Sequence, residues 1–371
     1  MNMKKIIDVN AHLHTPYSFS AFTDVRQALD MAAAEDVRIV GINDFYSMDG
    51  YREWNDECAT RHLYPMFNIE FISLNSEDQA AGLRVNDPNN PGRTYLSGKG
   101  LAYPVILSGK EAQMLADVRA ESNAQVERMC AKLNAHLDAV KAGFSIDFKQ
   151  VVKDLTRGSV RERHLAKALR MAVDAAAGNA GDRLALYERI FGGQPLKSAI
   201  ENDAAVENEI RSKLLKSGGA AFVPEDPKAF LPMETVCRII EAGGIPTYPF
   251  LADDAKGNFT DFEGDLQKAA DTLKKRGFKS VEFITTRNTT AVLEKYTDYL
   301  QDEGFIVTFG SEHNTPALEP IRLRTRDNAE GLSEKLRLTN YRGACAVAAH
   351  QAGLDSVEAG DELLQKTVFG I

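Results

Sequence analysis

The sequence predicts an α/β fold, a barrel or barrel-like sheet of parallel strands that is interrupted by a helical insertion. Short apolar segments alternate with amphipathic helical segments over residues 6–72. A polar stretch and a series of helical segments then follow, and the alternation resumes near residue 233. Alternating strands and helices produce parallel strands joined by right-handed crossovers.

The two parts of the barrel are predicted from the periodicity of apolar residues. In the first part, apolar runs predict strands at 6–9, 37–42 and 66–72, and the segments between them predict helices at 23–35 and 50–61. In the second part, the same reasoning predicts helices at 233–242, 265–276 and 290–303, and strands at 245–251, 280–285 and 305–309. The tail, 328–366, is predicted to be mostly helical.

The insertion begins with residues 75–108, which are too polar and too long for an ordinary connection. Helical patterns follow at 110–142, 148–155, 161–176, 183–190 and 204–215, and residues 217–227 have the composition of a linker. We therefore predict a barrel formed by 1–74 and 226–371, and an insertion over 75–225 made of a loop and helices.

Composition excludes several classes of protein. The chain has 371 residues, with 53 acidic and 44 basic side chains and a net charge of −9. This length fits two domains, or one large barrel with an insertion, and 44% apolar residues exclude a collagen-like or disordered chain. An acidic total without a basic tract argues against a nucleic-acid or membrane partner, although a local site can still bind an anion.

The four cysteines form no Cys-x-x-Cys pair, which argues against a zinc ribbon and a thioredoxin-type site. The N-terminus has no signal-peptide core, and no apolar run reaches the roughly 18 residues of a membrane span. We expect a reduced, cytoplasmic protein. The sequence leaves its oligomeric state open.

Polar residues able to bind metals or anions follow the predicted strands. They are His12, His14, Asp44, Glu70, Arg287, Glu312 and His313. Barrel enzymes assemble their sites at the carboxyl ends of the strands. The alternative is that polar residues simply accumulate where strands meet loops.

His12 and His14 are the strongest local signal. Residues i and i+2 of a strand point to the same face, so both imidazoles can bind one cation. Such a pair also arises by chance, but its place directly after an N-terminal apolar strand, and before Thr15-Pro-Tyr-Ser18, makes the motif stronger.

These motifs resemble the polymerase-and-histidinol-phosphatase (PHP) family of metal-dependent phosphoesterases, over about 5–74, His164 and 232–316. The similar segments are Asp8-Val-Asn-Ala-His-Leu-His-Thr-Pro-Tyr-Ser, Gly41-Ile-Asn-Asp44, Asn68-Ile-Glu70, Arg163-His164-Leu-Ala-Lys-Ala-Leu, Gly243-Gly-Ile-Pro-Thr-Tyr248-Pro and Gly310-Ser-Glu312-His313. The resemblance implies a distorted seven-stranded (β/α)7 TIM-like barrel and a phosphoester substrate.

Several positions depart from the family pattern. Phe45 and Tyr248 stand where the family has histidines, Glu312 replaces an aspartate, and Asn314 occupies the place of the last histidine. The resemblance therefore implies a reduced site of one or two ions. His12, His14, Glu70 and Glu312 would hold the first. Glu70 would bridge to a second ion held by His164 and by either Asp44 or His313.

Imidazole and carboxylate ligands suit zinc, manganese or iron, and leave a position open for water. Asp44, if it is not a ligand, is placed to orient or deprotonate that water. We expect a small, anionic substrate bound by Arg287 and by Arg93 and Lys99 of the 93–100 loop. Each of these assignments has an alternative. Arg287 could instead form a salt bridge to Glu282 or a neighbouring loop, and residues 97–100 could be a plain flexible loop. His164 could be a solvated residue on its helix.

Three functions remain open from the sequence. The first is a metal-dependent hydrolase of the PHP type that acts on a small phosphoester. The second is a metal-dependent hydrolase or isomerase of a sugar acid or an amide, suggested by the missing histidines. The third is a catalytically weak regulatory protein that keeps the barrel and one structural metal.

Overall fold

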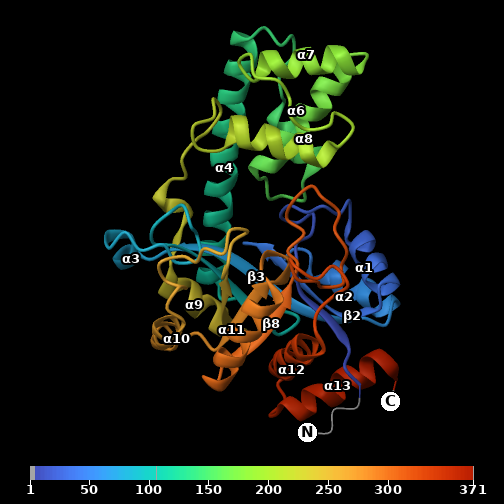
Figure 1. The fold of residues 1–371 in the computed structure, drawn as a ribbon, viewed down its shortest axis with the longest axis vertical. Helices are drawn as coiled ribbons and strands as arrows, with labels where there is room; N and C mark the ends of the chain where they lie inside the picture. Colours follow the sequence, from blue (N-terminus) through green and yellow to red (C-terminus); the bar gives the residue numbers. More distant parts are fainter. Residues whose placement is uncertain (1–4, 106, 371) are drawn as a thin grey trace.

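The computed structural model describes residues 5–105 and 107–370 (Figure 1). Its sheet has the strand order β1-β2-β3-β4-β6-β7-β8, and a short β5 pairs with β3. The strands are β1 Asp8–Leu13, β2 Val37–Phe45, β3 Tyr64–Leu74, β4 Arg93–Lys99, β5 Leu231–Pro232, β6 Ile245–Phe250, β7 Ser280–Ile284 and β8 Ile306–Gly310. All pairings are parallel except those of β4, which is antiparallel to β3 and β6.

The sheet closes on itself at the carboxyl ends of its first and last strands. Leu13 and Glu312 form a parallel bridge. The backbone N–H of Glu312 donates to the carbonyl of His12 at 3.0 Å, and the N–H of His14 donates to the carbonyl of Glu312 at 2.8 Å. The predicted α/β barrel is therefore confirmed as a nearly closed, barrel-shaped sheet.

Apart from the two-residue β5, the parallel strands are almost entirely buried, as expected for strands covered by helices. All residues of β2 except Arg38 are buried. The covering helices are α1 Val25–Ala34, α2 Tyr51–Thr60, α9 Met233–Glu241, α10 Leu266–Lys275, α11 Thr290–Asp302, α12 Glu334–Gln351 and α13 Val357–Phe369. The predicted helical tail is thus two helices, preceded by a loop over residues 311–333.

Strand β4 corrects the prediction of a loop between residues 75 and 108. A short helix, α3 Ser76–Ala80, comes first, and residues 93–99 then pair with two strands of the barrel. The polar residues of β4, together with Gly98 and Gly100, leave no alternating apolar pattern from which the strand could be predicted. Gly98 is needed because a Cβ there would lie 2.9 Å from the side chain of Ile240.

The remaining helices form a layer above the barrel (Figure 1). They are α4 Gly109–Ala139, α5 Phe148–Leu155, α6 Glu162–Ala176, α7 Ala180–Ile190 and α8 Asp203–Ile210, followed by a π-helical turn at Arg211–Leu215. This layer has its own apolar core, which includes Leu133, Leu169 and Tyr187. Helix α4 runs from beside the sheet up into the layer. No helix in the described part of the chain is long and apolar enough to cross a membrane.

Candidate metal centre and its cleft

Two histidines and one glutamate come together at the carboxyl end of the sheet. His12 lies on β1, His14 directly follows this strand on the same face, and Glu70 lies on β3. The two Nε2 atoms lie 3.2 Å apart. Oε2 of Glu70 lies 3.0 Å from Nε2 of His14 and 3.4 Å from Nε2 of His12. The structure therefore brings three of the predicted ligands into one buried group.

This group has the features of a cation site. Oε2 of Glu70 is buried, and among the described residues its polar neighbours are the ring nitrogens of His12 and His14, with no other hydrogen-bond donor. Burial alone would raise the pKa of Glu70, but its contacts with His12 and His14 outweigh burial and lower the pKa to about 2. An anionic oxygen thus faces two imidazole nitrogens, a donor set that suits zinc, manganese or iron.

Glu282 of β7 fixes the ring of His12. Its Oε2 lies 3.0 Å from Nδ1 of His12, and its Oε1 accepts a 2.5 Å hydrogen bond from Ser97. Burial lowers the pKa of His12, but the carboxylate of Glu282 outweighs this effect and raises the pKa to about 9. A carboxylate on Nδ1 keeps a proton there and leaves Nε2 as the atom that could bind a metal ion.

Asn43 also contacts this ring. Its Nδ2 lies 2.9 Å from Nε2 of His12, while its Oδ1 is buried without a hydrogen-bond partner among the described residues. A 180° turn of the amide exchanges these two atoms. In that orientation Asn43 would present a neutral oxygen toward Nε2 of His12.

Asp44 lies behind His14, on the far side of the ring from Glu70. Ser18 connects the two residues, because its hydroxyl lies 3.2 Å from Nδ1 of His14 and donates to Asp44 at 2.5 Å. The backbone N–H and the hydroxyl of Thr15 also donate to this carboxylate, at 2.8 and 2.5 Å. Asp44 is thus placed to orient His14, and the structure does not bring it into the three-residue group.

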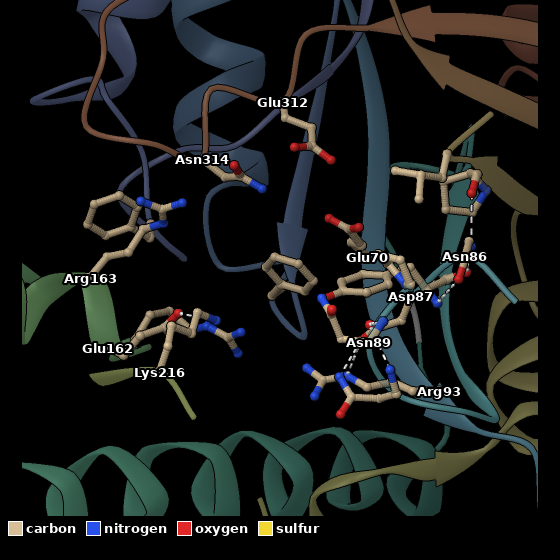
Figure 2. A pocket seen from close by; sticks show the side chains of 18 of the residues that line it. Glu70, Asn86, Asp87, Asn89, Arg93, Glu162, Arg163, Lys216, Glu312 and Asn314 are labelled. Atoms are coloured by element: carbon tan, nitrogen blue, oxygen red, sulfur yellow. Dashed lines mark hydrogen bonds and ion pairs between the residues drawn. The ribbon is translucent and has the colours of Figure 1, made fainter. Parts of the chain in front are cut away.

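Glu312 lies in the loop after β8, where it lines the cavity but stands outside the three-residue group. Its φ is 65° and that of His313 is 56°, and such left-handed non-glycine residues concentrate at functional sites. The backbone bonds to β1 hold this conformation, and the carboxylate pairs with Arg287. Figure 2 shows the side chains of Glu312 and Glu70 entering the same cavity from opposite sides.

The cavity above the centre has a volume of about 350 Å³. It lies between the strand ends and the start of α6, and Figure 2 shows Glu162, Arg163 and Lys216 across it from Glu70 and Arg93. The basic side chains that line it are Arg93, Arg161, Arg163, Arg211, Lys216 and Arg287. Glu70 is the member of the three-residue group that lines this cavity, with His12 and His14 buried behind it, and the walls carry an excess of positive charge.

The predicted anion-binding residues have different positions. Arg287 and Arg93 line the cavity, and Arg287 pairs with Glu312. Lys99, which we expected in a loop, is completely buried in β4. Its Nζ lies 2.7 Å from Oε2 of Glu282, so the structure places it inside the barrel beneath His12.

Two predicted histidine ligands lie outside the group. Nδ1 of His164 accepts the backbone N–H of Arg161 at 2.9 Å, and burial lowers the pKa of His164 to about 3. His313 uses both ring nitrogens elsewhere. Nδ1 contacts the hydroxyl of Ser311 and Nε2 contacts the carbonyl of Glu319, each at 2.8 Å.

The residues that depart from the family pattern lie in different places. Phe45 and Asn314 line the cavity. Tyr248 is buried and donates to Glu263 at 2.7 Å. The sequence did not reveal Glu282 as the partner of His12, and it gave no role to Arg161 or Arg163 in the site. The one available signal for these arginines was their place beside His164.

The comparisons with known proteins support the fold. No protein-family profile and no curated protein matches this sequence. A solved structure from Bifidobacterium adolescentis, described as a metal-dependent phosphoesterase, is similar, with a TM-score of 0.59 and 15% identity over 90% of this chain and 95% of that one. An amidohydrolase from Chromobacterium violaceum, solved with sulfate and no metal, has a TM-score of 0.55 and 15% identity over 88% and 93%.

Proposed function

We propose that this chain is a metal-dependent hydrolase that acts on a small phosphorylated substrate. The observation that carries the proposal is the pairing of the His12–His14–Glu70 group with a cavity whose walls are rich in arginine. The two structural neighbours, one described as a phosphoesterase and one as an amidohydrolase, agree with hydrolysis.

In this proposal His12, His14 and Glu70 hold one divalent ion, zinc, manganese or iron, and Glu312 completes the set from the opposite side. Such an ion lowers the pKa of a bound water and offsets negative charge on a phosphoryl group. Glu282 and the Ser18–Asp44 pair keep the two imidazoles oriented through their Nδ1 atoms. Arg287 and Arg93 add positive charge to the cavity wall, which favours an anionic substrate.

The test combines metal analysis with turnover. The purified protein should hold at least one tightly bound transition ion per chain, and it should hydrolyse members of a panel of phosphomonoesters and phosphodiesters with added manganese. The double variant His12→Ala, His14→Ala should lose the ion. A wild-type protein without a bound ion, or a loaded protein inactive on the whole panel, would overturn the proposal.

Hydrolysis or isomerisation of a sugar acid or an amide is the second candidate. Phe45 favours it, because an apolar ring stands in the cavity where the phosphoesterase family has a histidine. Turnover of carboxylate or amide substrates by a loaded protein that leaves phosphoesters intact would select this candidate.

A further inference from the structure

Phe45 connects the metal centre to an arginine of the helical layer. Its ring stacks on the imidazole of His14, with ring centroids 5.0 Å apart and planes inclined by 22°. The guanidinium carbon of Arg161 lies 5.0 Å from the centroid of the same phenyl ring. A guanidinium at this distance is attracted by the ring. Phe45 thus contacts both a residue of the three-residue group and a positive charge, although it cannot bind an ion itself.

Arg163 has a similar support. Its guanidinium carbon lies 5.6 Å from the centroid of the Phe19 ring, whose edge meets His164 at 4.9 Å between centroids. Arg161 and Arg163 flank the first residue of α6, and both line the cavity that contains Glu70. Two aromatic rings therefore hold two neighbouring arginines over the same space.

These two arginines differ from the other basic residues of the cavity in their partners. Arg93, Arg211, Lys216 and Arg287 each form an ion pair. Within the described part of the chain, no carboxylate lies within ion-pair distance of Arg161 or Arg163. Their polar contacts are neutral: Arg161 donates to Ser122 at 3.3 Å, and Arg163 donates to Asn208 at 3.0 Å.

The charge of Glu162 acts on both arginines, but its carboxylate already pairs with Arg211 and Lys216. The remaining excess of positive charge favours an anion in the cavity. Burial and the nearby charge of Arg211 lower the pKa of Arg163 to about 10, which still leaves it cationic near neutral pH. Planar guanidinium groups match the oxygens of a phosphate and can bind two of them at once.

We propose that Arg161 and Arg163 bind the non-bridging oxygens of the substrate phosphate and supply the positive charge that a second ion supplies in two-metal sites, so that the protein works with one ion. This inference rests on the proposed function. In sites with two ions, both metals clamp the reacting phosphoryl group. Here the second clamp consists of two arginines, held in place in part by Phe45, at the position where the resemblance expects a histidine ligand.

The test measures ion stoichiometry and phosphate binding on the full chain. Equilibrium dialysis with manganese should give one ion per chain for the wild type and for Arg161→Ala and Arg163→Ala. Titration calorimetry with inorganic phosphate on the manganese-loaded protein should show that each alanine variant weakens binding by about tenfold or more. Arg161→Lys, which keeps the charge but loses the planar fork, should weaken binding less than Arg161→Ala.

Arg157→Ala is the matched control, because Arg157 also lies over an aromatic ring, that of Tyr17, but does not line the cavity. It should bind phosphate like the wild type. Two ions per chain, or phosphate affinities of the Arg161 and Arg163 variants equal to that of the wild type, would overturn the inference. These results differ from failure of the proposed function, which would appear as a wild type with no ion or no turnover.

Discussion

Lys99 and Glu282 form an ion pair inside the barrel, with 2.7 Å between Nζ and Oε2 and neither side chain exposed. The same carboxylate oxygen lies 3.0 Å from Nδ1 of His12, and Lys99 also donates to the carbonyl of Ala11 at 3.0 Å. A buried ion pair recovers its desolvation cost only with good geometry and further hydrogen bonds, which this pair has. Glu282 is therefore held between a lysine and a proposed metal ligand.

We first predict that Glu282→Gln weakens manganese binding by about 10- to 100-fold, the usual effect of removing a partner of a metal-ligating histidine. The reason is that the ring of His12 loses the carboxylate that fixes its Nδ1 proton. Titration calorimetry with manganese measures the effect. Glu303→Gln is the matched control, since Glu303 pairs with Lys274 at the surface. Equal affinities of the two variants would contradict a positioning role for Glu282.

The second prediction concerns stability. Lys99→Met alone leaves the Glu282 charge without its strongest partner, and should lower the free energy of unfolding by about 3–5 kcal/mol. The double variant Lys99→Met, Glu282→Gln should cost clearly less than the sum of the single variants, because no unpaired charge remains. Urea unfolding of the wild type, the two single variants and the double variant gives the coupling free energy between Lys99 and Glu282. Additivity within about 0.5 kcal/mol would show that the two residues do not depend on each other.

The part of the centre that could be predicted comes from short motifs on parallel strands. His12 and His14 lie at the end of β1 and directly after it, Glu70 lies on β3, and the carboxyl ends of parallel strands meet at one edge. Lys99 and Glu282 could not be found this way. Ser97 and Glu282 are 185 residues apart, and His12 and Glu282 are 270 apart, so their contacts depend on how β4 and β7 enter the barrel. The sequence of β4 has no periodic apolar signal. The strand is defined by its pairing with β3 on one side and β6 on the other.

The third prediction separates two roles for Asp44. If Asp44 orients His14 through Ser18, Asp44→Asn keeps one bound ion per chain and lowers manganese affinity by about tenfold. His14→Ala, which removes a proposed ligand, should lose the ion. Metal analysis after dialysis, followed by calorimetry, distinguishes the two variants. Loss of the ion from Asp44→Asn to the same extent as from His14→Ala would mean that Asp44 is itself a ligand.

The fourth prediction concerns pH and Glu263. Burial raises the pKa of this carboxyl group from 4.5 to about 7, even though Tyr248 and the N–H groups of Leu251 and Ala252 donate to it. Between these two values the folded protein keeps a proton that the unfolded chain has lost. The contribution of Glu263 to stability therefore falls as pH rises from 4.5 to 7, by up to about 1.4 kcal/mol per pH unit, and levels off above 7.

Glu263→Gln removes this titration, so the stability of the variant relative to the wild type should increase from pH 5 to pH 8. Urea unfolding at each pH measures the difference. Parallel stability curves for the two proteins would show that Glu263 titrates at the same pH in the folded and unfolded states.

The last prediction concerns the close contact between Gly310 of β8 and His12. A Cβ at Gly310 would lie 2.2 Å from Cβ of His12, too close for any packed arrangement. Gly310→Ala must therefore displace His12 or the end of β8, and we expect it to reduce both the free energy of unfolding and the affinity for manganese. Gly109→Ala is the control, because Gly109 lies at the start of α4 and a Cβ there meets nothing within 4 Å. It should leave metal affinity unchanged and stabilise the fold slightly, since alanine favours helix more than glycine. A Gly310→Ala protein with wild-type metal affinity would show that His12 does not need its position against β8 to bind the ion.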